Sequence, residues 1–166
     1  MSAALLQLLR LASPALPVGG YSYSQGLEWG IDCGEVANVD TAQRWIGDML
    51  DHAQARFELP LLLALHAAWS AADIAEVQRL NQQYLASRET RELRAETLQM
   101  GYSMARLLSD LPGFPADVLA EFSPRSFPLA WSCVAARWGV PPEDAIAGYL
   151  WSWLENQVMA ALKAVP

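Results

Sequence analysis

The stretch PPEDAIAGYLWSWLENQVMAALKAVP, residues 141–166, repeats apolar side chains at a spacing of three and four residues. This spacing puts the side chains on one face of an α-helix, and prolines suit the first turn of such a helix. The stretch therefore predicts a long amphipathic helix with a nearly heptad stripe. The stripe consists of Ile146, Tyr149, Leu150, Trp153, Leu154, Gln157, Val158 and Ala161.

The same helical period recurs through the rest of the chain, whereas strand-type alternation of apolar and polar residues is hard to find. Together the patterns predict an all-α fold, a single-domain bundle of eight or nine helices over residues 1–166. The other expected helices cover Leu5–Leu11, Ser22 to about Gly34, Asp40–Ala53, Pro60–Ala71, Ile74–Leu85, about Glu89–Leu108, Ala116–Phe122 and Leu129–Trp138.

Composition excludes several classes of protein. The net charge is −7, which disfavours nucleic-acid binding because that function needs clustered basic residues. Hydrophobic residues make up 53% of the chain, which is unlike a disordered protein. No apolar run reaches the roughly 18 residues of a membrane span, and residues 1–17 lack the basic start of a signal peptide. We expect a cytoplasmic protein with reduced thiols.

Residues for catalysis or metal binding are sparse. His52 and His66 lie apart without a ligand motif, and Cys33 and Cys133 are expected to be buried structural thiols. Residues 20–24 nearly match a nucleophile elbow but lack its final glycine, and no phosphate-binding loop occurs. We therefore expect no catalytic residues, no cofactor and no resident metal.

The stretch SRETRELRAETLQMG, residues 87–101, has two interpretations. It is either a solvated helix face joined by salt bridges, such as one between Arg88 and Glu92, or a docking face whose arginines bind a partner's carboxylates. On the last predicted helix, Tyr149 and Trp151 are further candidates for partner contacts, since Trp151 lies at the edge of the apolar stripe. The residues alone thus indicate a helical binding module.

Two motifs occurring in this order resemble one family. LASPALPVGGYSYSQGLEW (residues 11–29) followed by SRETRELRAETLQMG is similar to the urease accessory protein UreF, and residues 127–166 are similar to that family's later helices. The resemblance implies a non-enzymatic cytoplasmic scaffold. With UreD (UreH in some lineages) and the GTPase UreG, it would assemble on apo-urease for nickel insertion, modulate GTP hydrolysis and homodimerise. Nickel would pass through the assembly.

The resemblance also implies sites for partner binding. The family's first motif falls on Gly20, Tyr21, Ser24, Gly26, Leu27 and Glu28, in a region near the face offered to the GTPase. The family's Arg-Glu-Thr-Arg-Glu motif falls on Arg88, Glu89, Arg91 and Glu92.

One departure from the family is expected to matter. Family members continue past Pro166 with a further helix and tail, so we expect the chain as given to expose apolar surface on its last helix and to self-associate. The alternative to a urease scaffold is an unrelated helical adaptor, and an enzyme using Ser22 or Ser24 is a weaker hypothesis.

Overall fold

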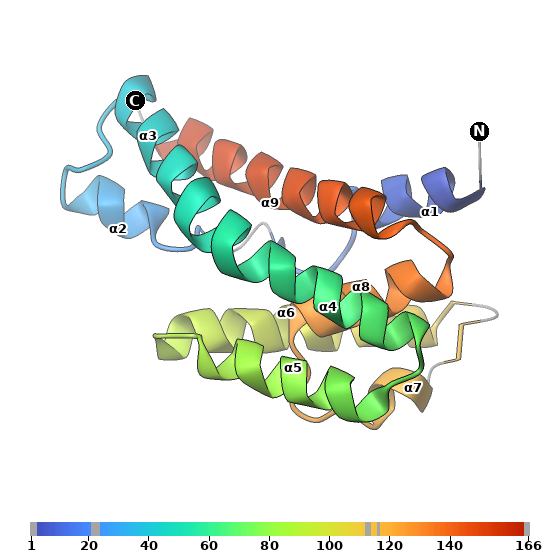
Figure 1. Cartoon of the computed structure of the whole chain (residues 1–166). Helices are drawn as coiled ribbons and strands as arrows, with labels where there is room; N and C mark the ends of the chain where they lie inside the picture. Colours follow the sequence, from blue (N-terminus) through green and yellow to red (C-terminus); the bar gives the residue numbers. More distant parts are fainter. Residues whose placement is uncertain (1–2, 21–23, 112–113, 116, 165–166) are drawn as a thin grey trace.

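A computed structural model describes residues 3–20, 24–111, 114–115 and 117–164 and confirms the all-α prediction (Figure 1). Within these ranges the chain contains helices and no strand. The helices are α1 (Ala3–Leu11), α2 (Leu27–Asp32), α3 (Val39–Met49), the π-helix η2 (Leu50–Glu58), α4 (Leu59–Ser70), α5 (Ile74–Ala86), α6 (Arg91–Ser109), α7 (Asp117–Ala120), α8 (Phe127–Arg137) and α9 (Pro142–Ala164).

Segments α3, η2 and α4 form one uninterrupted rod, where the sequence predicted two helices. Pro60 does lie in the first turn of α4, as predicted, but the chain does not break there. A π-helix closes i→i+5 hydrogen bonds, so its junction with an α-helix changes the bonding register. Proline lacks an amide hydrogen and is tolerated where such a hydrogen would have no helical partner. Counting the rod once, the described residues form eight helices.

The rod begins at a different residue from the one predicted. Asp40 was expected to start the helix, but Asn38 caps it instead: the Asn38 side chain accepts a hydrogen bond from the Thr41 amide at 3.0 Å. The Thr41 hydroxyl accepts one in return from the Asn38 amide, also at 3.0 Å. This reciprocal capping box satisfies amides that the first helical turn leaves without partners. The start predicted at Ser22 lies outside the described residues, and α2 begins after Gly26.

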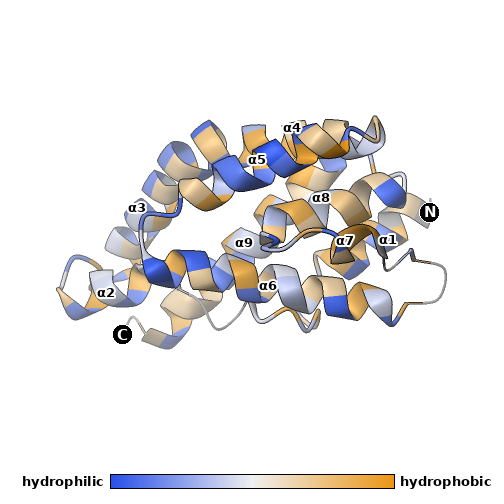
Figure 2. Ribbon diagram, turned by 90° about the horizontal axis from the view of Figure 1, so that it is seen from below, coloured by the Kyte–Doolittle hydropathy of each residue, from blue (hydrophilic) through white to orange (hydrophobic). Residues whose placement is uncertain are grey.

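Helix α8 forms the centre of the core. It packs against α4 and α6, and every residue from Pro128 to Ala135 is buried. Helix α6 approaches the turn before α8 closely at Gly101, where an added Cβ would lie 2.5 Å from the carbonyl oxygen of Arg125. In Figure 2 the α8 ribbon is mainly hydrophobic, whereas the first turn of α6 and much of α5 are hydrophilic. Helices α4 and α6 therefore bury apolar residues against α8.

Helix α9 runs antiparallel to the rod, with α1 beside its first half and α2 and α3 beside its second half (Figure 1). The Ser152 hydroxyl donates a hydrogen bond to the Ala12 carbonyl at 3.3 Å, which joins α9 to the residue after α1. A second, smaller core cluster of Leu27, Val36 and Ala42 joins α2 to α3 near the end of α9. No helix among the described residues has the length and hydrophobicity needed to cross a membrane.

Candidate partner interface and internal polar network

The two sequence motifs come together at one end of the molecule. Helix α2 and the first turn of α6 lie at the same end in both views (Figures 1 and 2). The Gln25 side chain connects them, since its Nε2 donates to Glu96 Oε1 on α6 at 2.9 Å. Its Oε1 accepts a hydrogen bond from Trp153 Nε1 on α9 at 2.6 Å. One amide thus joins the loop before α2 to two helices.

The first motif forms the turn that starts α2. The Gly20 carbonyl accepts a hydrogen bond from Asn156 Nδ2 at 2.8 Å, and Gly26 adopts a left-handed conformation with φ +92°. Ser24 is partly buried; its carbonyl accepts the Leu27 amide, and its hydroxyl accepts the amide of the exposed Glu28. These bonds give Ser24 and Gly26 a local structural role. The predicted contact at Tyr21 lies outside the described residues.

The second motif divides between surface and interior. Glu89, Arg91 and Glu92 are exposed, and the Thr90 hydroxyl caps α6 by accepting the Leu93 amide at 3.1 Å. Arg88 points inward instead. The predicted salt bridge between Arg88 and Glu92 is therefore wrong. Arg88 lies before the start of α6 and pairs with another carboxylate.

That carboxylate is Glu58, a buried residue in the last turn of η2. Arg88 Nη1 lies 3.4 Å from Glu58 Oε2. Glu58 Oε1 accepts hydrogen bonds from the hydroxyls of Tyr84 at 3.2 Å and Tyr149 at 2.5 Å. The Arg88 guanidinium also lies 4.3 Å from the centre of the Tyr84 ring, within the range of a cation–π interaction. Burial and the neighbouring Glu58 charge raise the pKa of both tyrosines, which therefore remain hydrogen-bond donors.

This network bears on two of the predicted partner contacts. Tyr149 is 5% exposed and bonded to Glu58, so its side chain lies in the core and not on the surface of the chain. Arg88 cannot form a forked surface contact while its guanidinium is paired with Glu58. The position of Arg88 in the helical period could not reveal its pairing with Glu58, because Glu58 lies 30 residues away in sequence.

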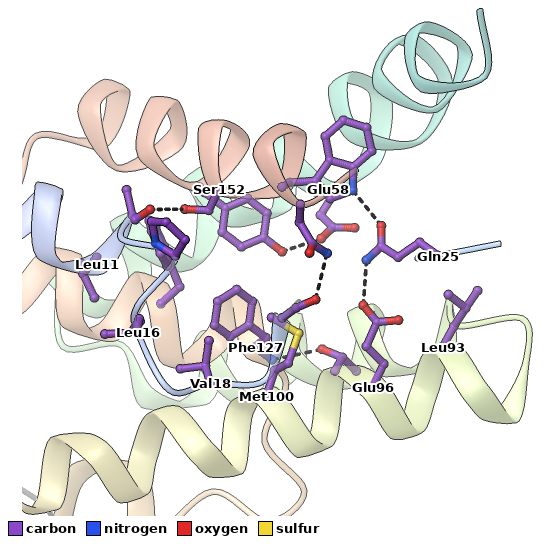
Figure 3. A pocket seen from close by; sticks show the side chains of 18 of the residues that line it. Leu11, Leu16, Val18, Gln25, Glu58, Leu93, Glu96, Met100, Phe127 and Ser152 are labelled. Atoms are coloured by element: carbon purple, nitrogen blue, oxygen red, sulfur yellow. Dashed lines mark hydrogen bonds between the residues drawn. The ribbon is translucent and has the colours of Figure 1, made fainter. Parts of the chain in front are cut away.

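A cavity of about 80 Å³ lies beside the network (Figure 3). Apolar side chains line part of it, including Leu11, Leu16, Val18, Met100 and Phe127, and polar side chains from the network line the rest. Glu96 is one of these. Burial raises the pKa of Glu96 to about 7, although the hydrogen bond from Gln25 opposes that rise. A cavity of this size with polar walls has room for several water molecules.

The candidate metal ligands are separate from one another. His52 is exposed, and His66 Nε2 lies 3.0 Å from the Val140 carbonyl oxygen. Cys133 is buried as expected, and burial raises its thiol pKa to about 12, but Cys33 is exposed, which contradicts the prediction for that residue. In the described part of the chain, no group of three or more histidine, cysteine, aspartate or glutamate side chains could hold a metal ion.

Comparison with known proteins decides the family. A protein-family model described as UreF matches residues 36–166, which comprise most of the chain. The chain belongs to the UreF family. It is 59% identical to the urease accessory protein UreF of Azoarcus sp. (strain BH72) over 168 residues, covering 98% of this chain and 71% of that relative.

Two further UreF relatives agree. The urease accessory protein UreF of Dechloromonas aromatica (strain RCB) is 52% identical, covering 98% of this chain and 73% of the relative. That of Methylobacillus flagellatus is 49% identical, covering 99% of this chain and 74% of the relative. The resemblance inferred from the two motifs is therefore confirmed over nearly the whole chain.

The outer face of α9 in this UreF chain is apolar and uncovered. Trp151 is 60% exposed and Leu162 is 72% exposed, with Val158 between them 42% exposed. An apolar groove between α3 and α9 runs beside this face, lined by Val39, Ala42, Gln43, Ile46, Leu154, Val158, Ala161 and Leu162. Trp151 was predicted to lie at the edge of the apolar stripe of this helix, and its side chain is exposed.

Sequence reasoning missed the roles of Gln25 and Glu58. Glu58 could have been noticed, because it lies at helical spacing between Gln54 and the leucines Leu61, Leu62 and Leu65, on the buried side of its helix. A carboxylate on an apolar face requires a buried partner. No local signal identifies Gln25 as a link, since its partners lie 71 and 128 residues away.

Proposed function

We propose that this UreF-family chain is a non-enzymatic scaffold in urease maturation. With UreD (UreH in some lineages) and the GTPase UreG, it assembles on apo-urease in the cytoplasm, supports nickel insertion and modulates GTP hydrolysis by UreG. The observation that carries the proposal is the family membership, together with relatives named urease accessory protein over 96–99% of this chain. Nickel is the cargo of the assembly in this proposal, and the chain has no resident cofactor.

The position of the two motifs supports a docking face at the α2–α6 end. Exposed Glu28 lies on α2, and exposed Glu89, Arg91 and Glu92 lie at the start of α6. Arginine forms forked hydrogen bonds with carboxylates, and charges of both signs on one surface favour a particular partner orientation. We assign the GTPase-containing assembly to this face.

The exposed stripe of α9 supports the proposed homodimer. Helix α9 has two acidic residues in its first turn, Glu143 and Asp144, and a lysine, Lys163, in its last turn. Two α9 helices packed antiparallel would bring opposite charges together at both ends of an apolar contact through Trp151.

The docking proposal is tested by reconstituting urease activation from purified apo-urease, UreD, UreG, nickel, GTP and this protein. Arg91→Glu should weaken capture of the UreG–UreD assembly by roughly tenfold or more, the value of a charge-assisted hydrogen bond. Arg106→Glu is the matched control, since Arg106 is exposed near the other end of α6. Tyr21→Ala should weaken capture without changing the helical content. Equal capture by the Arg91 and Arg106 variants would contradict the assigned face.

The scaffold role itself is tested by a separate reconstitution experiment. Omitting the protein from the reconstitution should abolish GTP-dependent activation, whereas adding it should restore activation and change the GTP hydrolysis rate of UreG. Full activation without it would overturn the proposed function.

A further inference from the structure

The backbone before α2 adopts an uncommon conformation at two successive residues. Gln25 has φ +50° and Gly26 has φ +92°, so both residues adopt the left-handed conformation. Gln25 does so although it is not a glycine. This region is unfavourable for residues with a Cβ, and it persists where surrounding contacts hold it. Gln25 is therefore held by its side-chain contacts more than by its backbone preference.

The Gln25 amide uses its donor and its acceptor on different helices. Nε2 donates to Glu96 on α6, and Oε1 accepts from Trp153 on α9, as the dashed lines in Figure 3 show. All these side chains line the same cavity. Loss of the Gln25 amide would leave a buried carboxylate and an indole N–H without these partners, so the contacts are costly to break.

We propose that Gln25 is a positioning residue for the α2 end of the molecule: its amide latches the start of α2 onto α6 and α9, and protonation of Glu96 favours the closed latch because it removes a buried charge. The consequence for docking of a partner rests on the function proposed above, whereas the latch itself does not. The moving part is the turn of Ser24–Gly26 with the first residues of α2.

The charges around Glu96 determine the direction of the effect. The charged groups that face it are Glu58 from η2, which raises its pKa, and Arg88 from the turn before α6, which lowers it. Tyr84 and Tyr149, which bond Glu58, stay neutral because their pKa values are raised. Burial is the largest influence and favours the neutral Glu96 carboxyl.

In the proposed open form, the turn of Ser24–Gly26 moves away and water reaches Glu96, so the pKa of Glu96 falls toward its ordinary value of 4.5. The ionised carboxylate therefore favours the open form, and the neutral carboxyl favours the closed form. With a pKa of about 7 in the closed form, linkage makes opening about tenfold more favourable at pH 8 than at pH 6.

Amide hydrogen exchange of the isolated chain tests this. The amides of Leu27, Glu28 and Gly30 bond to the turn, so their protection, corrected for the intrinsic exchange rate at each pH, reports on opening. We expect protection to fall about tenfold from pH 6 to pH 8 in the natural protein. Glu96→Gln retains an acceptor without a titrating proton and should show no such fall.

A second pair of variants separates the latch from general stability. Gln25→Met should lower protection of these amides at least tenfold at both pH values, because it removes the bonds to two helices. Gln99→Met, on the exposed side of α6, is the matched control and should change nothing. The Leu65 amide in the α4 core reports on global unfolding in each sample.

Two results would overturn the latch: the same pH response in Glu96→Gln as in the natural protein, or unchanged protection in Gln25→Met. Because no partner is present, these results are independent of whether the docking proposal holds. Partner capture at pH 6 and pH 8 then tests the link between the two. Stronger capture at pH 6 that is lost in Gln25→Met would support it, and equal capture would restrict the latch to the isolated chain.

Discussion

Replacing Arg88 with methionine removes the cation that compensates a buried carboxylate. Glu58 is 4% exposed, and Arg88 Nη1 lies 3.4 Å from it. Without Arg88, the Glu58 charge keeps the hydrogen bonds from Tyr84 and Tyr149 but loses its ion pair. Breaking a buried pair by removing one partner costs about 3–5 kcal/mol of unfolding free energy. Because the tyrosine donors remain, we expect the lower end, about 3 kcal/mol.

Urea denaturation followed by circular dichroism measures this loss. Arg91→Met is the matched control, because Arg91 is exposed in the same motif, and it should change the unfolding free energy by less than about 0.5 kcal/mol. A double variant, Arg88→Met with Glu58→Gln, should lose at least about 1 kcal/mol less than the sum of the single variants, since the pair interacts. If Arg88→Met costs no more than Arg91→Met, the assignment of Arg88 to the interior is refuted.

The other predictions use similar measurements. Gly101→Ala should cost about 1–3 kcal/mol of unfolding free energy, because the added methyl group overpacks against the turn before α8. Gly47→Ala has no neighbour near its added Cβ and should gain about 0.5–1 kcal/mol. Equal effects of the two variants would contradict the close approach at Gly101. Since the pKa of Glu96 is raised to about 7, the neutral Glu96 carboxyl contributes to the free energy of unfolding. This contribution is complete below pH 4.5 and is lost as the pH rises through 7. Between pH 5 and pH 8 the natural protein should therefore lose about 2–3 kcal/mol of unfolding free energy, whereas Glu96→Gln should not. Urea titrations at pH 5 and at pH 8 measure this difference. Sedimentation velocity should show that the natural chain self-associates as its concentration rises. The double variant Trp151→Glu with Leu162→Glu should abolish this association. A natural chain that stays monomeric at high concentration would show that the exposed α9 stripe does not form a dimer contact.

The sequence by itself determined the helices and the family. Helix α9 begins at its proline pair and α5 follows the predicted range, because hydrogen bonds between residues four apart and an apolar stripe depend on neighbours in the chain. The motif at residues 11–29 and the motif at residues 87–101 sufficed to indicate UreF before any fold was known. Boundaries were less certain where capping residues compete, as between Asn38 and Asp40.

Only the tertiary structure decided what the motif residues do. Arg88 and its neighbour Glu89 share one charged run, but one is paired in the interior and the other is exposed, because only Arg88 meets a buried carboxylate. Tyr149 and Trp151 lie two residues apart on one helix, and the packing of α8 and the rod against α9 buries the first and leaves the second exposed. Gln25 acquires its role from helices 71 and 128 residues away. The positions of these partners follow from how whole helices pack, and local periodicity carries no information about that packing.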